Sequence, residues 1–453
     1  MTYPDSANRN LDLVRSVQTA LQANELAEVR EQLAVLHPAE LADLLESLPA
    51  ATRDELWVHI SPDIEGDVLV HVSDPVRTGI LEGMRPDEVA AATESLEIDD
   101  AADILQDLSE DVVGEVLRSM DGQNRQRISA ILDYDEHSAG GLMNVDTVAV
   151  RADVDVDVVL RYLRLLGEKV PDHTDSLIVV DRQNTYLGLL PLATLLTATP
   201  ETVIGELMFL DADAIRAETP ASDVVTIFEQ RDLFSAAVVD DDGKLLGRIT
   251  IDDVVDVMRD QAAHSAMSAA GLDENDDLFA PVMGAAKRRA AWLAVNLATA
   301  FLAAWVIGLF EATIDQIVAL AVLMPVVASM GGVAGMQTLT IVIRGMALGQ
   351  IGRANARIIV TREISIALWN CLLWASVVAL VSGLWFQDLS LGLVIGAALV
   401  INLVTAAIAG ALIPIILKRL NIDPALAGAV ALTTVTDVTG FFAFLGLAAV
   451  VLM

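Results

Sequence analysis

The chain has 453 residues, a formal net charge of -35 and a hydrophobic fraction of 54%. A field this acidic repels nucleic acid and anionic lipid and attracts cations, divalent ones most strongly, so no nucleic-acid partner is expected. The single cysteine, Cys371, excludes an intrachain disulfide and a cysteine zinc site, and the six histidines show no HExxH spacing.

The negative charge is confined to one part of the chain. The first 290 residues hold 57 acids and 22 bases, which accounts for the whole of the -35, and the remaining residues hold six of each. The N-terminus has no apolar run before a cleavage site, so no signal peptide is expected. The composition predicts an acidic soluble half joined to a neutral, apolar membrane half.

Residues 1–138 show the pattern of short amphipathic helices. The string ADLL at 42–45 recurs as ADIL at 102–105, and VHIS at 58–61 recurs as VHVS at 70–73. Such repeats are typical of stacked helical units, in which each unit buries its apolar face on the next. We therefore predict an acidic, all-α superhelical N domain over residues 1–138.

A duplicated unit of a different kind occupies residues 139–262. LIVVDRQNTYLGLLPLATLL begins at Leu177 and AAVVDDDGKLLGRITIDDVV begins at Ala236, with matched residues shifted by 59 positions. The residue pattern of each copy predicts an apolar strand, a polar turn, a second strand and a helix. The pair resembles tandem CBS domains, an α/β regulatory module that binds adenine nucleotides.

The resemblance to CBS domains allows a test of individual residues. Their nucleotide sites usually follow G-x-[I/V]-[S/T]-x-x-D, where the hydroxyl and carboxylate hold phosphate and ribose. The second copy has Gly247, Thr250 and Asp253 at these positions, whereas the first has Pro191 and Thr194 where Thr250 and Asp253 would map. The resemblance implies at most one site for ATP or another adenine nucleotide. The alternative is a structural pair that only transmits movement.

Five apolar stretches are long enough to cross a bilayer and predict a five-helix transmembrane domain over residues 291–453. They fall near 291–310, 317–343, 358–385, 391–417 and 425–453. The segment before the first stretch and the connections between the stretches are alternately basic and acidic, beginning with Lys287, Arg288 and Arg289. The positive-inside rule then predicts a multi-pass protein of the cell membrane with a cytoplasmic N-terminus and an external C-terminus.

Two of these spans carry unusual residues. The second contains MPVVASMGGVAGMQTLT (324–340), whose glycines allow close helix packing or leave carbonyls facing a cavity. The last contains Asp437 and no Lys or Arg, and a charge at that depth costs about 2.5–3.5 kcal/mol on insertion scales. Such a residue faces a water-filled path, a cation or a buried partner. A structural Asp bonded to a neighbouring helix is the alternative.

The whole chain resembles the MgtE family of magnesium channels. The matching strings are DYDEHSAGGLM (133–143), LLGRITIDDVVDVM (245–258), MPVVASMGGVAGMQT (324–338), DPAL (423–426) and TTVTDVTG (433–440). The resemblance implies a homodimer with the pore between its two membrane halves. It also implies a connecting plug helix, expected over residues 263–290.

The resemblance further implies which residues line the ion path. Asp437 is the ion-selective residue, and Mg²⁺, which keeps most of its water, suits two such carboxylates facing each other. Backbone carbonyls near Thr433 contact the hydrated ion. Asp423 forms a weaker site at the inner mouth, although a helix N-cap before Pro424 is the favoured alternative. The pore-lining motif of the second span consists of Gly331, Gly332, Gly335 and Gln337.

Two positions depart from the family pattern. Many members have Asn after the paired glycines of the second span, where this chain has Val333. An amide that helps to hold the hydrated ion is therefore missing, and the filter is assembled differently or is less selective. The acidic run that tends to follow the second CBS domain is replaced by QAAHS at 261–265. Part of the usual closing switch is then expected to be absent.

Regulation is expected to use the acidic surfaces. Facing N and CBS domains repel each other at low Mg²⁺, and bound Mg²⁺ draws them together and shifts the population toward a closed pore. The predicted regulatory ligands are Asp99, Asp100 and Asp103 in the N domain and Asp252, Asp253 and Asp256 in the CBS region. For each, a solvated helix face is the alternative. Sensing that has moved elsewhere would use Asp273, Glu274, Asp276 and Asp277.

These patterns predict a Mg²⁺-selective channel gated by cytosolic Mg²⁺. One alternative widens the ion range to Co²⁺ or Mn²⁺, because of Val333. Another, of a different class, is a membrane-anchored CBS sensor of nucleotides or cations. Asp437 argues against the sensor, because a plain anchor needs no charge in mid-membrane. No P-loop, nucleophile–base pair or metal-hydrolase motif is present in the sequence, so an enzyme is not expected.

Overall fold

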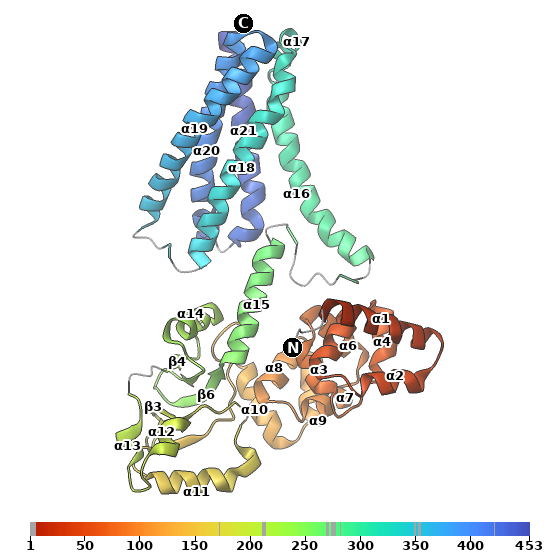
Figure 1. The fold of residues 1–453 in the computed structure, drawn as a ribbon, viewed down its shortest axis with the longest axis vertical. Coiled ribbons are helices and arrows are strands. Elements are labelled where there is room, and N and C mark those ends of the chain that lie inside the picture. The colour runs from red at the N-terminus through yellow and green to blue at the C-terminus, as the bar shows by residue number, and fades with distance from the viewer. Residues whose placement is uncertain are drawn as a thin grey trace. The chain divides into compact units, whose positions relative to one another are not determined.

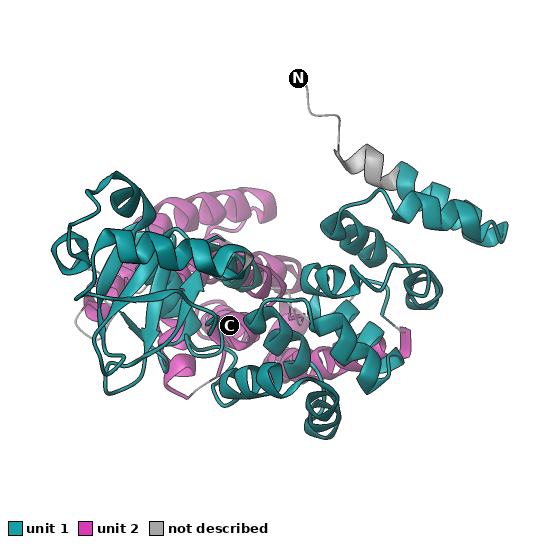
Figure 2. Cartoon of the chain, turned by 90° about the horizontal axis from the view of Figure 1, so that it is seen from below, with its two compact units in different colours: residues 1–261, 275–280 teal, residues 262–274, 281–453 magenta. Residues whose placement is uncertain are grey.

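The computed structural model divides the chain into two units, which Figure 2 colours separately. It describes residues 6–171, 173–210, 214–268, 271–272, 278–280, 282–347, 350–351, 355–420 and 422–453, with only the backbone at 6–11 and 168. We call residues 1–261 with 275–280 the acidic unit, and residues 262–274 with 281–453 the membrane unit. The predicted acidic and apolar halves thus correspond to separately packed bodies.

The described residues up to 132 form short helices. They are α1 (Ser6–Gln22), α2 (Leu26–Leu33), α3 (Pro38–Glu46), α4 (Ala50–Trp57), α5 (Glu65–His71), α6 (Asp74–Gly83), α7 (Pro86–Thr93), α8 (Ile98–Gln106), α9 (Glu110–Ser119) and α10 (Gly122–Leu132). Pro38 and Pro86 each take the first helical position, where the missing N–H leaves no hydrogen bond unmade. The apolar faces of these helices share one core.

The repeated sequence string has a structural counterpart in this helical part. Its two copies begin at the fifth residue of α3 and of α8, and both helices are nine residues long. Leu44 and Leu45 of the first copy, like Ile104 and Leu105 of the second, are buried. The repeat therefore marks the apolar face that each helix turns toward the common core.

The duplicated α/β unit contains two sheets of the same design. The first copy comprises β1 (Ala149–Arg151), α11 (Val156–Leu166), the 3-10 turn η1 (Gly167–Lys169), β2 (Ser176–Val180), β3 (Tyr186–Pro191), α12 (Leu192–Thr197) and α13 (Ile204–Leu207). The second comprises β4 (Ile215–Arg216), α14 (Ala221–Arg231), β5 (Ser235–Val239), β6 (Leu245–Thr250) and α15 (Ile251–Ser268). In each sheet the strands lie in chain order, with the first pair parallel and the second antiparallel.

The shift of 59 residues recurs in the pairing of the strands. Val179 pairs with Gly188 in the first sheet and Val238 with Gly247 in the second, and the register shifts immediately after each valine. Equivalent residues also meet between the copies, because the hydroxyls of Ser176 and Ser235 lie 3.2 Å apart. The two copies therefore pair about a local twofold axis.

The membrane unit is a bundle of long helices that alternate in direction (Figure 1). They are α16 (Val282–Gly308), the short α17 (Glu311–Gln316), α18 (Ala319–Ala347), α19 (Ala356–Phe386), α20 (Leu389–Arg419) and α21 (Pro424–Val451). Five of them are long and apolar enough to cross a membrane, which confirms the five predicted spans. The short helix α17 was not predicted.

The helix α20 forms the centre of this bundle. It is the most buried of the five long helices and packs against α18, α19 and α21. Small residues permit the close approach, since a Cβ at Gly410 would lie only 2.7 Å from the carbonyl oxygen of Gly335 on α18. Gly410 and Gly335 therefore bring α20 and α18 together.

The connecting helix expected over residues 263–290 is not one helix. The helix α15 ends at Ser268 and α16 begins at Val282. Gly271 lies between them with φ of +71°, a left-handed conformation that glycine tolerates and that ends a helical path. The basic residues Lys287, Arg288 and Arg289 accordingly belong to the first membrane-spanning helix.

Candidate regulatory cluster and candidate ion path

Two helices of the acidic unit gather the carboxylates predicted as regulatory ligands. We call this set the acidic cluster: Asp99, Asp100 and Asp103 of α8 with Asp252, Asp253 and Asp256 of α15. Burial and then the charge of Asp253 raise the pKa of Asp99 well above its usual value. Two residues predicted from separate parts of the sequence, Asp99 and Asp253, therefore lie close enough to repel each other.

The raised pKa values show that full ionisation of the acidic cluster is unfavourable. Burial, followed by the charges of Glu97, Asp252 and Asp256, raises the pKa of Asp100 to about 6. Burial chiefly raises that of Asp253 to about 7 and that of Asp103 to about 8. Near neutral pH, each of these groups gains from a proton or a nearby cation.

The cluster does not have the geometry of a closed metal cage. Across the described part of the chain, no three His, Cys, Asp or Glu side chains converge closely enough to hold a bare metal ion. Mg²⁺ usually keeps several of its water molecules and is held through one or two carboxylates. Coordination of a bare ion by three of these carboxylates would therefore require them to move.

One residue that the sequence did not single out ties the cluster together. The side-chain amide of Asn144, which is 2% exposed, donates to Asp99 Oδ1 at 3.2 Å and also to the carboxylate of Glu97. The backbone of Asn144 exchanges two hydrogen bonds with Arg248 on β6, at 2.7 and 2.9 Å. Asn144 therefore links the helical N domain to the second sheet at the acidic cluster.

The residues of the nucleotide motif already serve the local fold. The backbone N–H and the hydroxyl of Thr250 both donate to Asp253 Oδ2 at 3.0 Å, which caps the start of α15. A Cβ at Gly247 would lie 2.7 Å from the carbonyl oxygen of Asn144, so the close strand contact alone requires glycine there. Asp253 thus belongs both to the motif and to the acidic cluster.

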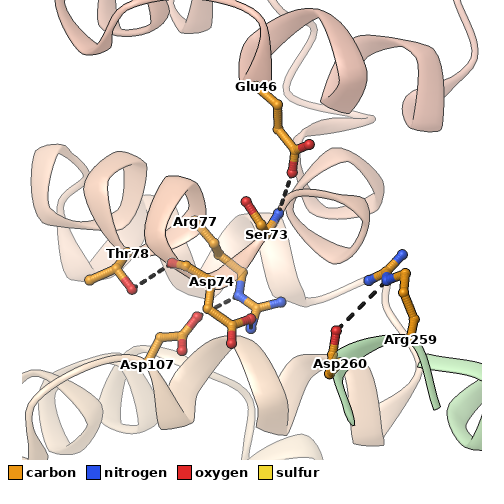
Figure 3. Close-up of polar contacts among 8 residues, drawn as sticks. All are labelled: Glu46, Ser73, Asp74, Arg77, Thr78, Asp107, Arg259 and Asp260. Carbon is orange, nitrogen blue, oxygen red and sulfur yellow. Dashed lines mark hydrogen bonds and ion pairs between the residues drawn. The ribbon is translucent and has the colours of Figure 1, made fainter. Parts of the chain in front are cut away.

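Two arginines offset part of this negative charge: Arg259 of α15 lies 3.5 Å from Asp256, and Arg77 of α6 acts on Asp103. Arg77 of α6 forms an ion pair with Asp107 and a second with Asp74, the latter at 2.8 Å (Figure 3). Its charge lowers the pKa of Asp103, although burial outweighs this effect. Since two other acids already bind Arg77, its charge offsets only part of the cluster's repulsion.

In the membrane unit, Asp437 lies at the edge of the packed face of α21. It is half-buried, beside a buried stripe that consists of Gly428, Leu432, Thr436, Gly440, Phe444, Leu445 and Ala448. Among the described residues Asp437 makes no hydrogen bond or ion pair. One turn earlier, the carbonyl of Thr433 accepts a hydrogen bond from the Thr436 hydroxyl at 3.1 Å. Asp437 is therefore a half-buried carboxylate that is unpaired among the described residues, and its role as an ion ligand stays a prediction.

The glycine motif of the second span divides into packed and open positions. A Cβ at Gly331 would collide with the side chain of Asn402 on α20, and one at Gly335 would lie 2.8 Å from Leu432 on α21. Gly332 meets nothing within 4 Å, and Gln337 is exposed. Within this chain, Gly331 and Gly335 serve helix packing, and a pore-lining role for the motif stays a prediction.

Asp423 has the structural role that the sequence favoured. It is the N-cap of α21, with Oδ1 accepting from the backbone N–H of Ala425 at 2.9 Å. Its other oxygen lies 3.1 Å from Nε2 of His264, a residue of the segment in which the acidic run is lost. A single histidine therefore reaches this end of α21 directly.

Two further polar residues inside the membrane unit escaped assignment from the sequence. Glu363 of α19 is 5% exposed and accepts from the hydroxyl of Thr338 on α18 at 3.3 Å. Asn402 of α20 is fully buried. Polar residues in apolar spans were a signal that could have found both. Asp273, Glu274, Asp276 and Asp277 lie outside the described residues.

Five membrane-spanning helices, joined to a CBS module and to an acidic helical domain, define the class of multi-pass membrane transporters with a regulatory soluble part. Models of known families agree along the chain. The divalent cation transporter domain MgtE matches residues 324–447, the MgtE intracellular N domain matches 36–137, and a CBS domain matches 204–260. The chain belongs to the MgtE family, which consists of transporters and not of enzymes.

Individual relatives extend over almost the whole sequence. The chain is 30% identical to the magnesium transporter MgtE of Thermus thermophilus, over 97% of this chain and 98% of the relative. It is also 30% identical to that of Enterococcus faecalis, over 94% of each. A crystal structure of the cytosolic domain of the Mg²⁺ channel MgtE with ATP covers 54% of this chain and 99% of its own, at 31% identity and a TM-score of 0.49. The two magnesium transporters of this family, from Thermus thermophilus and Enterococcus faecalis, do not favour the anchored-sensor and broad-range alternatives.

Proposed function

We propose that this chain provides a passive, Mg²⁺-selective path across the cell membrane. The observation that carries the proposal is Asp437, a half-buried carboxylate within a membrane-spanning helix that has no Lys or Arg. Its position would be costly without a cation or water beside it. Mg²⁺ is held through a retained water shell by one or two carboxylates, which is what an isolated Asp on each chain offers.

The proposal includes a homodimer with the path between the two membrane units. One chain supplies a single Asp437, and a second copy would supply the facing carboxylate. In support, Asp437 lies at the edge of the packed face of α21 rather than within it. A hydrated divalent cation between two such groups relieves the desolvation and the mutual repulsion of both. The basic ends of the helices favour a cytoplasmic N-terminus.

The test is Mg²⁺ uptake by cells that lack their own Mg²⁺ transporters. Wild-type protein should restore uptake, and Asp437→Ala should abolish it at an equal amount of protein in the membrane. Asp315→Ala is the matched control, because this exposed acid lies on α17 outside the long helices. Equal uptake by wild type and Asp437→Ala would contradict the assignment of the path, and a wild type without uptake would contradict the function.

We further propose that cytosolic Mg²⁺ closes this path through the acidic cluster. Burial and mutual repulsion raise the pKa of Asp99, Asp100, Asp103 and Asp253. Mg²⁺ that binds the compact arrangement more tightly than the separated one would shift the population toward it. In the full-length protein, millimolar Mg²⁺ should slow proteolysis between α10 and β1, and an unchanged rate would contradict the proposal.

A nucleotide site at the CBS pair remains part of the proposal. It is supported by Gly247, Thr250 and Asp253, which match the phosphate- and ribose-binding pattern. ATP would have to compete with the hydrogen bonds that Asp253 accepts from Thr250. Binding of ATP to wild type but not to Thr250→Val, measured by calorimetry on the purified protein, would support this site. Equal binding by both would remove it.

A further inference from the structure

The side chain of Asn402 lies where three membrane-spanning helices meet. It extends from α20, and its Nδ2 donates a hydrogen bond to the carbonyl of Val327 on α18 at 2.8 Å. Two glycines leave room for the same amide. A Cβ at Gly331 of α18 would collide with it, and a Cβ at Gly440 of α21 would lie 2.7 Å from Nδ2. One side chain therefore sets the spacing of both helices.

This junction is adjacent to Asp437 along α21. Gly440 follows Asp437 by three residues, which is less than one helical turn, and Thr436 just before it is fully buried. The height and rotation of the turn that carries Asp437 are therefore fixed by what Gly440 packs against. On α18, the same amide fixes the glycine segment at Gly331.

The amide is not explained by packing alone. Among the described residues, Oδ1 of Asn402 is buried and has no hydrogen-bond partner. A buried acceptor without a donor is destabilising, and an apolar side chain of similar shape would avoid that cost. An amide retained at this position therefore indicates a requirement for its donor group and its shape.

We propose that Asn402 is a positioning residue of the ion path, which sets ion selectivity by holding the glycine segment of α18 and the Asp437 turn of α21 at a fixed spacing. The inference rests on the proposed function. Asn402 acts through the helices and does not touch the ion. It supplies a rigid amide inside the bundle, whereas Val333, at the position where many family members have Asn, is 57% exposed.

The physical reason for an effect on selectivity is the geometry of hydrated Mg²⁺. This ion keeps a strict octahedral shell and loses water reluctantly. A path that recognises the shell needs a constant width, since small changes admit ions that shed water more easily. Loosening the junction should therefore favour Mn²⁺ over Mg²⁺, without removing the carboxylate that attracts both.

The first test measures Mg²⁺ and Mn²⁺ fluxes into vesicles that contain the full-length protein. Asn402→Leu should lower the ratio of Mg²⁺ to Mn²⁺ flux at least about fivefold. Ser382→Ala is the control, because Ser382 is a polar residue of α19 that is 3% exposed, and its ratio should stay unchanged. A wild-type ratio in Asn402→Leu overturns the inference alone. A wild type that carries no Mg²⁺ overturns the proposed function and, with it, this inference.

The second test is a double-mutant cycle that does not depend on the stability of Asn402→Leu. Gly331→Ala should lower Mg²⁺ flux about tenfold, because its methyl group collides with the amide, but less than about twofold in an Asn402→Ala background. If Gly331→Ala fails to accumulate in the membrane, recovery of the double variant reports the same coupling. Equal losses in both backgrounds would overturn the inference.

Discussion

In the acidic unit, six carboxylates from α8 and α15 face one another, whereas in the membrane unit Asp437 stands alone on its helix. Burial, together with the charges of neighbouring acids, raises the pKa of several groups in the first case and leaves them ready to take up protons or cations. Isolation in the second case leaves one charge that neither Lys nor Arg of its own helix offsets. Crowded carboxylates suit a sensor, and an isolated carboxylate suits a path.

The sharpest way to break this comparison is to remove the charge of a membrane carboxylate while keeping its shape. Asp437→Asn should lower Mg²⁺ flux by about a hundredfold or more, because an intramembrane cation site loses the charge that compensates the ion's lost solvation. Glu363→Gln makes the same change in a buried residue that Thr338 already satisfies. It should keep more than a third of the flux. Similar losses of Mg²⁺ flux in both variants would show that the charge of Asp437 contributes no more to transport than the charge of Glu363.

The acidic cluster should respond to pH in a defined direction. A carboxyl whose pKa is raised by folding binds its proton more tightly in the folded state. Its stabilising effect is present at low pH and is lost as the pH rises through the folded values, which are about 6, 7 and 8 for Asp100, Asp253 and Asp103.

In the full-length protein, proteolysis between α10 and β1 should therefore become about tenfold faster from pH 5 to pH 8 without Mg²⁺. Millimolar Mg²⁺ should slow it at pH 8 and have little effect at pH 5, where protons already neutralise the cluster. Protection by Mg²⁺ that is equal at both pH values would show that the cation binds elsewhere.

The sequence predicted both the acidic cluster and Asp437, but not the contacts that other residues make with the cluster. The acidic cluster followed from the excess of acids in the N and CBS domains, whose facing surfaces were expected to bind Mg²⁺. Asp437 followed from the cost of a charge in an apolar span. Asn144, in contrast, follows a glycine-rich string and has no periodic pattern of its own. Its role depends on a contact with Asp99, which lies 45 residues away.

The same distinction applies to the fold. Composition and periodicity were enough for the five spans and the duplicated sheets, because each rests on local apolar patterns. They did not predict the break near Gly271, where one backbone conformation ends a helix. The contact between Gly331 and Asn402 was also beyond the sequence, because it requires knowing that α20 packs between α18 and α21.

A repeat in the N domain offers a matched test of the cluster. Asp103 of α8 and Asp43 of α3 occupy the same place in the repeated string, but Asp43 is exposed while burial and neighbouring acids raise the pKa of Asp103 to about 8. Asp103→Asn should remove repulsion and lower the Mg²⁺ concentration that half-protects the protein by about fivefold. Asp43→Asn should leave it unchanged. Equal shifts would mean that net charge, and not the cluster, sets the response.

The contact between His264 and Asp423 should have the smallest effect on Mg²⁺ flux. It is a single pair of side chains, whereas the acidic cluster contains six carboxylates. Both side chains are about a third or more exposed, at 43% and 34%, and polar contacts of this exposure contribute about 0.2–1 kcal/mol. His264→Ala should therefore raise Mg²⁺ flux at high cytosolic Mg²⁺ by no more than roughly fivefold. The control is His173→Ala in the acidic unit, which should change nothing. A larger rise would show that this single histidine, and not the acidic cluster, holds the path closed.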